Sequence, residues 1–324
     1  MALIDTLTQR TEKQGGLFAI ETAGIIYNIF TTILIACLYN QMDHPGEMLL
    51  GRMGIVVMTG LFFALYQWHP CRLTTFVRVT GQLALLAYWY PDTYEFNCLF
   101  TNLDHLFANW EQALFSCQPA IVFSQLCCNK FWSEAFNMGY FAYYPMIFIV
   151  VLFYFFARYK KYMEAAFIVL CSFFIYYLIY IFLPVTGPQY YFHAIGMDQV
   201  MAGNFSEVGD YFKYHSELLP APNEIDGFFF RMVEQSQATG ERPTAAFPSS
   251  HVGISTILMI LAWKGKRLLF VMLLPFYILL CGATVYIQAH YLIDAIAGFV
   301  SAFLIYACSK SIYSRTREYR FTQQ

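Results

Sequence analysis

The chain has 324 residues, of which 58% are hydrophobic and only 12% are charged. Soluble domains carry about 25% charged residues, so this composition excludes an ordinary soluble protein and indicates a polytopic membrane protein. The aromatic content of 19% is typical of side chains that face lipid and headgroups. The formal net charge of -2 supplies no excess of cations for binding a nucleic acid, and we expect no such partner.

Eight apolar segments are candidate membrane spans, since a span needs about 20 mostly apolar residues. They cover residues 17–39, 53–69, 73–90, 138–157, 164–183, 250–263, 268–287 and 291–309. The second and third are the weakest, because only His69-Pro70-Cys71-Arg72 separates them. The first carries Glu21 and lacks a small-residue cleavage site, so we interpret it as a retained span rather than a cleaved signal. The fold class predicted is all-α.

Lysine and arginine are unevenly divided between the two sides of this arrangement, and cytoplasmic loops are the side enriched in them. One side collects 14 of the 19: Arg10, Lys13, Arg72, Arg78, Arg158, Lys160, Lys161, Lys264, Lys266, Arg267, Lys310, Arg315, Arg317 and Arg320. We therefore expect both termini in the cytoplasm. Segments 91–137 and 184–249 and the junction around His290 would lie on the outer face, which is periplasmic, lumenal or extracellular.

The first outer segment contains an amphipathic stretch, residues 98–137, that is too polar to span and predicts an interfacial helix. The alternative is a brace that lies along the membrane. Four of the nine cysteines fall there: Cys98, Cys117, Cys127 and Cys128. Their spacing fits no zinc site; it leaves a disulfide open, with small buried thiols as the simpler interpretation.

The stretch R-P-T-A-A-F-P-S-S-H-V-G, residues 242–253, joins the second outer segment to a candidate span. Pro248 and Ser249 are helix-start signals, so we expect Ser250 and His251 in the first helical turn. Backbone N–H groups and the positive end of the helix dipole favour a phosphate there. Alone the pattern is weak, because a histidine near a helix start is often a cap or interface residue.

A helical hairpin returns the chain to the same face and presents V-Y-I-Q-A-H-Y-L-I-D-A-I-A-G, residues 285–298. If the helix has already begun, His290 and Asp294 share one face. Asp294 can then accept a hydrogen bond from one ring nitrogen of His290 and leave the other nitrogen as a nucleophile or base. The alternative is an interfacial histidine beside a helix-cap aspartate. The second histidine, His251, favours chemistry, because displacement at phosphorus needs one group to attack and another to protonate the leaving oxygen.

These two stretches resemble the second and third motifs of the type 2 phosphatidic acid phosphatase superfamily, and the resemblance covers the last five candidate spans. It implies a six-helix core with about two extra N-terminal spans. We expect the N-terminal spans and the interfacial helix in residues 1–137. The catalytic membrane core, including the outer loop 184–249, would occupy residues 138–324.

The resemblance also implies roles for three residues of this chain. His290 would form a phosphohistidine, Asp294 would orient that histidine, and His251 would protonate the leaving group. No cofactor and no metal ion are implied. A metal site built from the same three residues is the alternative, but too few further ligands accompany them.

Two phosphate-clamping cations of the family pattern are missing from the sequence. Thr284 stands where the third motif has arginine, and Gln189 stands in the first-motif region where an arginine is expected nearby. Arg242, six residues before Pro248, is the candidate substitute. The candidate substrate-binding residues are Ser249, Ser250, Arg242, Gln189 and Tyr190.

Charge suggests what this loss means for the substrate. A phosphomonoester is close to dianionic at pH 7 and rewards several cations, whereas a diester carries one charge. Few cations therefore favour transfer of a substituted phosphoryl group between alcohols. The segment N-L-D-H-L-F-A-N-W-E-Q-A-L-F, residues 102–115, is also similar to the inositol phosphorylceramide synthase branch of sphingolipid metabolism. That branch moves a phospho-headgroup from a glycerophospholipid to ceramide.

The sequence thus predicts an integral membrane enzyme that transfers a phospho-headgroup between lipids through a phosphohistidine. Its partners would be a phospholipid donor and a lipid alcohol or water as acceptor; the oligomeric state stays open. A lipid phosphate or polyprenyl diphosphate phosphatase is the alternative within the same class. A non-catalytic lipid-binding or transport protein is the alternative of another class. Transporters show polar residues near mid-span, and Glu21, Arg78 and Gln82 are sparse candidates for such a role.

Overall fold

The computed structural model describes residues 2–222 and 227–322. The described residues form helices, turns and loops without a strand, apart from an isolated bridge between Arg10 and Cys71. The long helices are α2 (Ala19–Leu38), α3 (Pro45–Trp68), α9 (Tyr143–Ala157), α10 (Tyr162–Phe182), α14 (Ser250–Gly265), α15 (Arg267–Tyr286) and α16 (Leu292–Thr322). The shorter ones are α1 (Ala2–Thr8), α4 (Arg72–Ala84), α5 (Leu86–Asn97), α6 (Asp104–Phe115), α7 (Pro119–Leu126), α8 (Lys130–Phe141), α11 (Pro188–Ile195), α12 (Met197–Met201) and α13 (Phe228–Gly240). The all-α prediction is confirmed.

Several helices are long and apolar enough to cross a membrane. In the described residues five segments meet this test: Ala19–Gln41, Pro45–Trp68, Tyr159–Phe182, Arg267–Tyr286 and Leu292–Thr316. Helices α8 and α9 add a sixth if their bend of 43° lies within one broken span. The chain is therefore a polytopic helical membrane protein.

The predicted spans differ from these helices at three places. The segment 73–90 is broken into α4 and α5, of 13 and 12 residues, and α14 has only 16 residues, so neither reaches the usual length of a span. The segment predicted at 53–69 begins earlier, at Pro45. It extends through Arg52 because Asp92 of α5 neutralises that cation inside the protein.

Two buried ion pairs hold the N-terminal helices together. Arg52 of α3 binds Asp92 of α5 at 2.7 Å, and Arg78 of α4 binds Glu21 of α2. Losing one partner of such a pair costs about 3–5 kcal/mol, because the other charge is left buried and unpaired. Glu21 and Arg78 therefore compensate each other's charge between two N-terminal helices.

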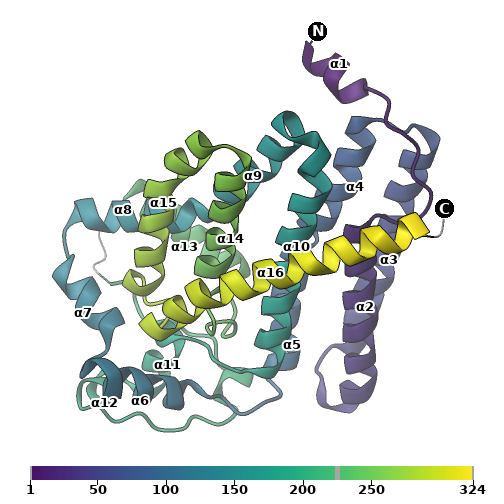
Figure 1. The fold of residues 1–324 in the computed structure, drawn as a ribbon. Helices are drawn as coiled ribbons and strands as arrows, with labels where there is room; N and C mark the ends of the chain where they lie inside the picture. Colours follow the sequence, from purple (N-terminus) through teal and green to yellow (C-terminus); the bar gives the residue numbers. More distant parts are fainter. Residues whose placement is uncertain (1, 223–226, 323–324) are drawn as a thin grey trace.

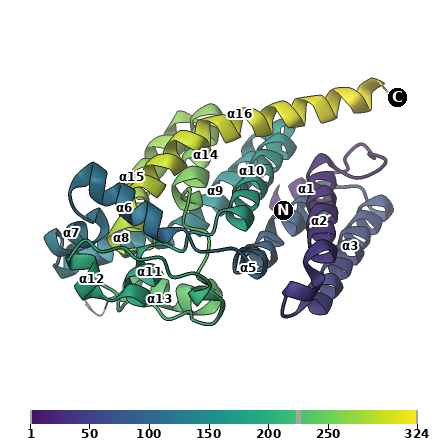
Figure 2. The same ribbon diagram turned by 90° about the horizontal axis from the view of Figure 1, so that it is seen from below.

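Helix α10 lies at the centre of the bundle. It contacts α2 and α5 on the side of the N-terminal helices, and α9, α14 and α16 on the other side (Figures 1 and 2). Helices α6, α11 and α12 gather at one end of the molecule, opposite the α9–α10 and α14–α15 connections (Figure 1).

The predicted single interfacial helix at 98–137 is instead three elements, α6, α7 and the bent start of the next candidate span, α8. All nine cysteines lie in the described part of the chain, and all are free thiols. In the predicted outer loop 184–249, residues 223–226 lie outside the described residues.

Candidate active site

The start of α14 places His251. The helix begins at Ser250 as predicted, with Ser249 as its N-cap: the Ser249 hydroxyl accepts a hydrogen bond from Val252 N at 3.4 Å. The N–H of Ser250 donates to the hydroxyl of Tyr180 in α10 at 2.9 Å. Two of the first N–H groups of α14 therefore have protein partners already, which leaves fewer for a phosphate than the sequence suggests.

The turn between α15 and α16 places His290. Helix α16 begins only at Leu292, so His290 precedes the helix and does not share a helical face with Asp294 as the sequence suggests. The backbone N–H of His290 donates to Thr284 O at 3.0 Å, which holds the turn against the end of α15. Gln288 in this turn has a φ of 63°, a left-handed conformation that a sequence pattern of regular helices cannot reveal.

The imidazole of His290 has a defined orientation. Its Nδ1 lies 2.8 Å from the carbonyl oxygen of Ala246. A carbonyl only accepts hydrogen bonds, so Nδ1 carries the proton and Nε2 of the neutral ring keeps its lone pair. Burial lowers the pKa of His290 to about 4, and the ring is therefore neutral at neutral pH.

The two histidines face one another across the two motifs. Nε2 of His290 lies 3.5 Å from Nδ1 of His251, although the residues are 39 apart in sequence. The ring of His251 packs against Tyr140 of α8 and Tyr143 of α9, with centroid distances of 4.7 and 4.5 Å. These two rings form an aromatic clamp that confines the imidazole of His251.

Asp294 lies beside this pair but does not make the hydrogen bond that the sequence suggests. Its Oδ2 lies 3.8 Å from Nδ1 of His290, beyond hydrogen-bond distance. The same oxygen accepts from the N–H of Tyr291 at 2.9 Å and so caps α16. The backbone carbonyl of Asp294 accepts from Ser249 N at 3.0 Å, which joins the two histidine motifs directly.

Glu241 is a site residue that sequence reasoning did not single out. Its carboxylate accepts hydrogen bonds from the Tyr140 hydroxyl at 3.0 Å and from Nε2 of Gln189 at 3.1 Å. Burial raises the pKa of Glu241, while the nearby His290 acts in the opposite direction. The first-motif residue Gln189 thus contacts a carboxyl group near the histidines rather than replacing a cation.

Two further acids, Asp104 and Glu111 of α6, bind the backbone of the site. The carboxylate of Asp104 accepts from Thr186 N, Gly187 N and the hydroxyl of Tyr291 at 2.7, 2.9 and 3.1 Å. Glu111 accepts from Ile293 N at 3.2 Å. The available signal was their spacing of seven residues, which places both carboxylates on one face of a helix.

The predicted substrate-binding residues separate into two groups. Ser249, Ser250 and Gln189 lie with the histidine motifs, as the contacts above show. Tyr190 is buried in an outer cluster, where its ring lies against Phe212 at 6.4 Å. Arg242 is exposed. Burial raises the pKa of Tyr190, and the positive charge of Arg242 acts in the opposite direction.

The charges of the site are mostly acidic. Among the described residues, the hydrogen bonds and ion pairs of Gln189, His251 and His290 involve no lysine or arginine. Thr284 is fully buried, and its hydroxyl donates to Cys281 O at 2.9 Å within α15. In the same part of the chain, no three His, Cys, Asp or Glu side chains are arranged to hold a metal ion.

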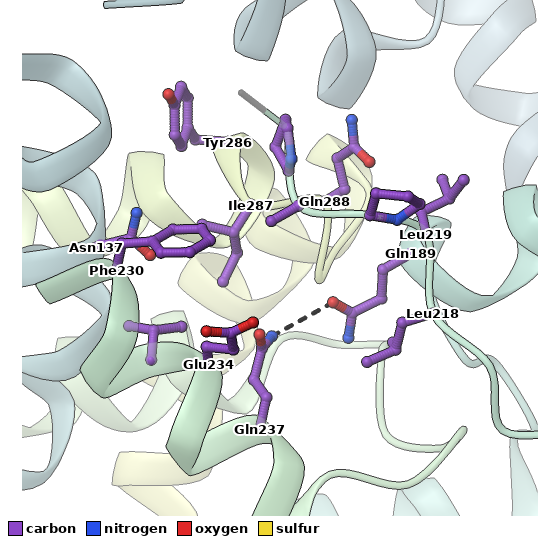
Figure 3. A pocket seen from close by; sticks show the side chains of 14 residues that line it. Asn137, Gln189, Leu218, Leu219, Phe230, Glu234, Gln237, Tyr286, Ile287 and Gln288 are labelled. Atoms are coloured by element: carbon purple, nitrogen blue, oxygen red, sulfur yellow. Dashed lines mark hydrogen bonds between the residues drawn. The ribbon is translucent and has the colours of Figure 1, made fainter. Parts of the chain in front are cut away.

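A cavity of about 510 Å³ adjoins the turn that carries His290 (Figure 3). Its walls combine amides, from Gln189, Gln237 and Gln288, with apolar and aromatic side chains such as Phe230 and Tyr286. Figure 3 shows the amides of Gln189 and Gln237 bonded to each other at 3.4 Å across the cavity. The histidines do not line it, but Gln189 connects its wall to Glu241.

A family model described as PAP2 superfamily matches residues 105–308, more than half of the chain. The chain belongs to the PAP2 superfamily. Phosphatases and phosphotransferases make up this superfamily, which supports an enzyme acting on phosphate esters. Comparison with curated proteins and with solved structures gives no match. The matched region of this PAP2 protein begins in α6 and includes both histidine motifs.

Proposed function

We propose that this PAP2 protein is a lipid phosphotransferase that moves a phospho-headgroup from a glycerophospholipid to a lipid alcohol through a phosphohistidine on His290. One observation carries the proposal: the imidazoles of buried His290 and half-buried His251, from separate motifs, face each other with ring nitrogens 3.5 Å apart. The nitrogen of His290 that faces His251 is the one with the lone pair, because the other donates to Ala246.

The first half-reaction would break the bond between phosphorus and the lipid leaving oxygen. Nε2 of His290 attacks phosphorus while His251, as imidazolium, gives its proton to the departing alkoxide. The anionic phosphodiester favours that protonated form of His251 when it binds. Diacylglycerol leaves, and the headgroup phosphate is joined to His290.

The second half-reaction would restore the enzyme. The acceptor hydroxyl gives its proton to His251, its oxygen attacks phosphorus, and the bond from phosphorus to His290 breaks. No proton is gained or lost over the cycle, and no oxidant or cofactor is required. The carbonyl of Ala246 holds the ring of His290 in place, and the carboxylate of Asp294 lies 3.8 Å from the same ring nitrogen.

The charge of the site supports a diester as the donor. The contacts of both histidines and Gln189 involve no cation among the described residues, and the half-buried carboxyl group of Glu241 lies nearby. A dianionic monoester would meet little compensation there, whereas a monoanionic diester needs less. The amide-lined cavity supports a headgroup that remains attached to phosphorus, and ceramide is the acceptor that the resemblance to the inositol phosphorylceramide synthases suggests.

The proposal includes an orientation in the membrane. Both termini would be cytoplasmic and the histidines would face the outer side, in agreement with the basic residues of the α9–α10 and α14–α15 connections, such as Lys160 and Lys266. The same chemistry with water as acceptor describes a lipid phosphate or polyprenyl diphosphate phosphatase, and PAP2 membership supports that second candidate as well.

Lipid mass spectrometry on the reconstituted protein tests the proposal. Proteoliposomes would contain phosphatidylinositol or phosphatidic acid, each with and without ceramide, and His290→Ala would serve as the control. We expect a new phosphosphingolipid and equimolar diacylglycerol that depend on both phosphatidylinositol and ceramide. Brisk hydrolysis of phosphatidic acid without transfer to any alcohol would replace this proposal with the phosphatase.

A further inference from the structure

Two carboxyl groups cap the start of α16. Oε1 of Glu111, from α6, accepts a hydrogen bond from Ile293 N at 3.2 Å, and Oδ2 of Asp294 accepts one from Tyr291 N at 2.9 Å. Both side chains are fully buried. Glu111 therefore does from another helix what Asp294 does from within α16, and the two carboxyl groups cap consecutive parts of one helix terminus.

The remaining oxygen of each carboxyl group has no partner among the described residues. These atoms are Oε2 of Glu111 and Oδ1 of Asp294, and both are buried away from solvent. An unsatisfied buried carboxylate oxygen is costly, and the negative charge of Asp294 also acts against a negative charge on Glu111. One proton would remove one of the two negative charges. It would also supply a hydrogen bond, because a protonated carboxyl group donates where a carboxylate can only accept.

We propose that Glu111 and Asp294 share one proton, carried on Oε2 of Glu111 and donated to Oδ1 of Asp294. Glu111 is then a positioning residue: it fixes the carboxylate of Asp294 behind His290 without touching the substrate. This inference rests on the proposed function for its catalytic consequence, but the shared proton is a property of the fold and can be observed without turnover.

The surroundings of the pair fit a proton held at neutral pH. Burial raises the pKa of Glu111 to about 8, and the negative charge of Asp294 acts in the same direction. The other titratable groups around the pair are Asp104, which lies on α6 like Glu111, and His290 and Tyr291, which lie in the turn before α16. The negative charge of Asp104 acts on Asp294. Among the described residues none of these contacts supplies a lysine or arginine to take the place of the proton.

Infrared difference spectroscopy of the detergent-purified full chain tests the shared proton. A protonated carboxyl group has a C=O band, distinct from that of a carboxylate, which shifts in D₂O. Between neutral pH and about pH 10, the wild type should lose one such band. Glu111→Gln should not show this loss. In Asp294→Asn the band should disappear at lower pH, because the neighbouring negative charge is gone.

A matched control is available in α8. The carboxylate of Glu134 also caps backbone N–H groups, those of Phe229 and Phe230 at 3.1 and 3.0 Å, but it lies at α13 rather than α16. Glu134→Gln should therefore leave the band and its titration as in the wild type. Identical titrations of the band in the wild type and Glu111→Gln would overturn the shared proton.

The pH profile of turnover tests the positioning role. Turnover by the wild type should fall as the pH rises through about 8, where the pair loses its proton. Glu111→Gln can still donate to Asp294 and accept from Ile293, so the part of the alkaline fall that comes from the carboxyl pair should be absent, and only the deprotonation of His251 should limit turnover. Glu111→Ala lacks both contacts and should be slower than Glu111→Gln throughout the range.

The infrared and kinetic experiments test the shared proton and the positioning role of Glu111 separately. If the infrared band behaves as expected but Glu111→Gln keeps the alkaline fall of the wild type, Glu111 does not position the site. A protein that shows the band and transfers no phosphoryl group would contradict the proposed function and leave the shared proton standing.

Discussion

Nε2 of His290 lies 3.5 Å from Nδ1 of His251, and this separation leaves no room for a phosphorus atom directly between the two nitrogens. A bound phosphate must therefore sit to one side of the pair, or the His251 ring must move within its clamp of Tyr140 and Tyr143. In either case one nitrogen can attack phosphorus while the other reaches the leaving oxygen, as general acid–base catalysis with a nucleophile requires.

His290→Ala should abolish turnover while the protein still folds and inserts. The substitution removes the nucleophile, but besides the contact with His251 it breaks one hydrogen bond of the ring, to Ala246, worth about 1 kcal/mol of stability. Thermal unfolding checks that the variant folds, and lipid mass spectrometry on the same preparation measures its turnover. Retention of more than about a tenth of the turnover would remove the phosphohistidine mechanism.

His251→Ala should depend on the leaving group. The loss of turnover should be severe for a natural substrate, whose leaving group is diacylglycerol. It should be milder for an aryl phosphodiester, whose leaving oxygen scarcely needs a proton. Comparing kcat for the two substrates measures this. Equal losses on both would mean that His251 only positions the phosphate.

Asp294→Asn should reduce turnover less than removal of either histidine. The asparagine oxygen can still accept from Tyr291 N, and the carbonyl of Ala246 still holds Nδ1 of His290. We expect a loss of about 10- to 100-fold, the scale of a supporting group that orients a functional histidine. Asp294→Ala should be slower still, because the cap of α16 is lost. Equal rates for the two variants would show that the Tyr291 contact has no part in orienting the site.

The acid limb of the rate that is set by His290 should lie at an unusually low pH. A free histidine has a pKa of about 6.5, whereas burial lowers that of His290 to about 4. Since the neutral ring of His290 is the nucleophile, the loss of kcat/KM that comes from protonating this ring should be centred at a pH of about 4. An acid limb centred at the ordinary histidine value would indicate an exposed, unshifted His290.

Adding a cation to the site should shift its substrate preference. Gln189 lines the cavity and contacts Glu241, so Gln189→Arg would neutralise that carboxyl group and add donors for a dianion. Relative turnover of phosphatidic acid over phosphatidylinositol should rise by about 5- to 150-fold, which corresponds to about 1–3 kcal/mol for a hydrogen bond between charged groups. Gln189→Met is the uncharged control. No change relative to Gln189→Met would contradict the charge argument.

The sequence predicted the features that depend on local signals. The N-cap at Ser249 and the first turn at Ser250 followed from residue types alone, and the structure has both. The hydrophobic composition likewise predicted an all-helical membrane protein. Motif spacing brought His251 and His290 to one site because a hairpin of two helices, α14 and α15, returns the chain to the same end.

Contacts that depend on irregular backbone were beyond the sequence. The partner of His290 is the carbonyl of Ala246, whose direction is set by an extended loop and not by a side chain type. Glu241 had the appearance of a solvated loop acid until the fold brought Tyr140 and Gln189 to it. The break at Leu85 between α4 and α5 could not be predicted from hydropathy, because a broken and a continuous span have the same composition.

Trapping the covalent intermediate tests the central claim most directly. The purified protein would be mixed with donor lipid labelled with radioactive phosphorus, quenched rapidly in base and digested for mass spectrometry, because a phosphohistidine survives base and is lost in acid. We predict label on His290 in the wild type, more of it when no acceptor alcohol is present, and none in His290→Ala. Label on another residue, or sustained turnover with no labelled protein at any time, would contradict a phosphohistidine at His290.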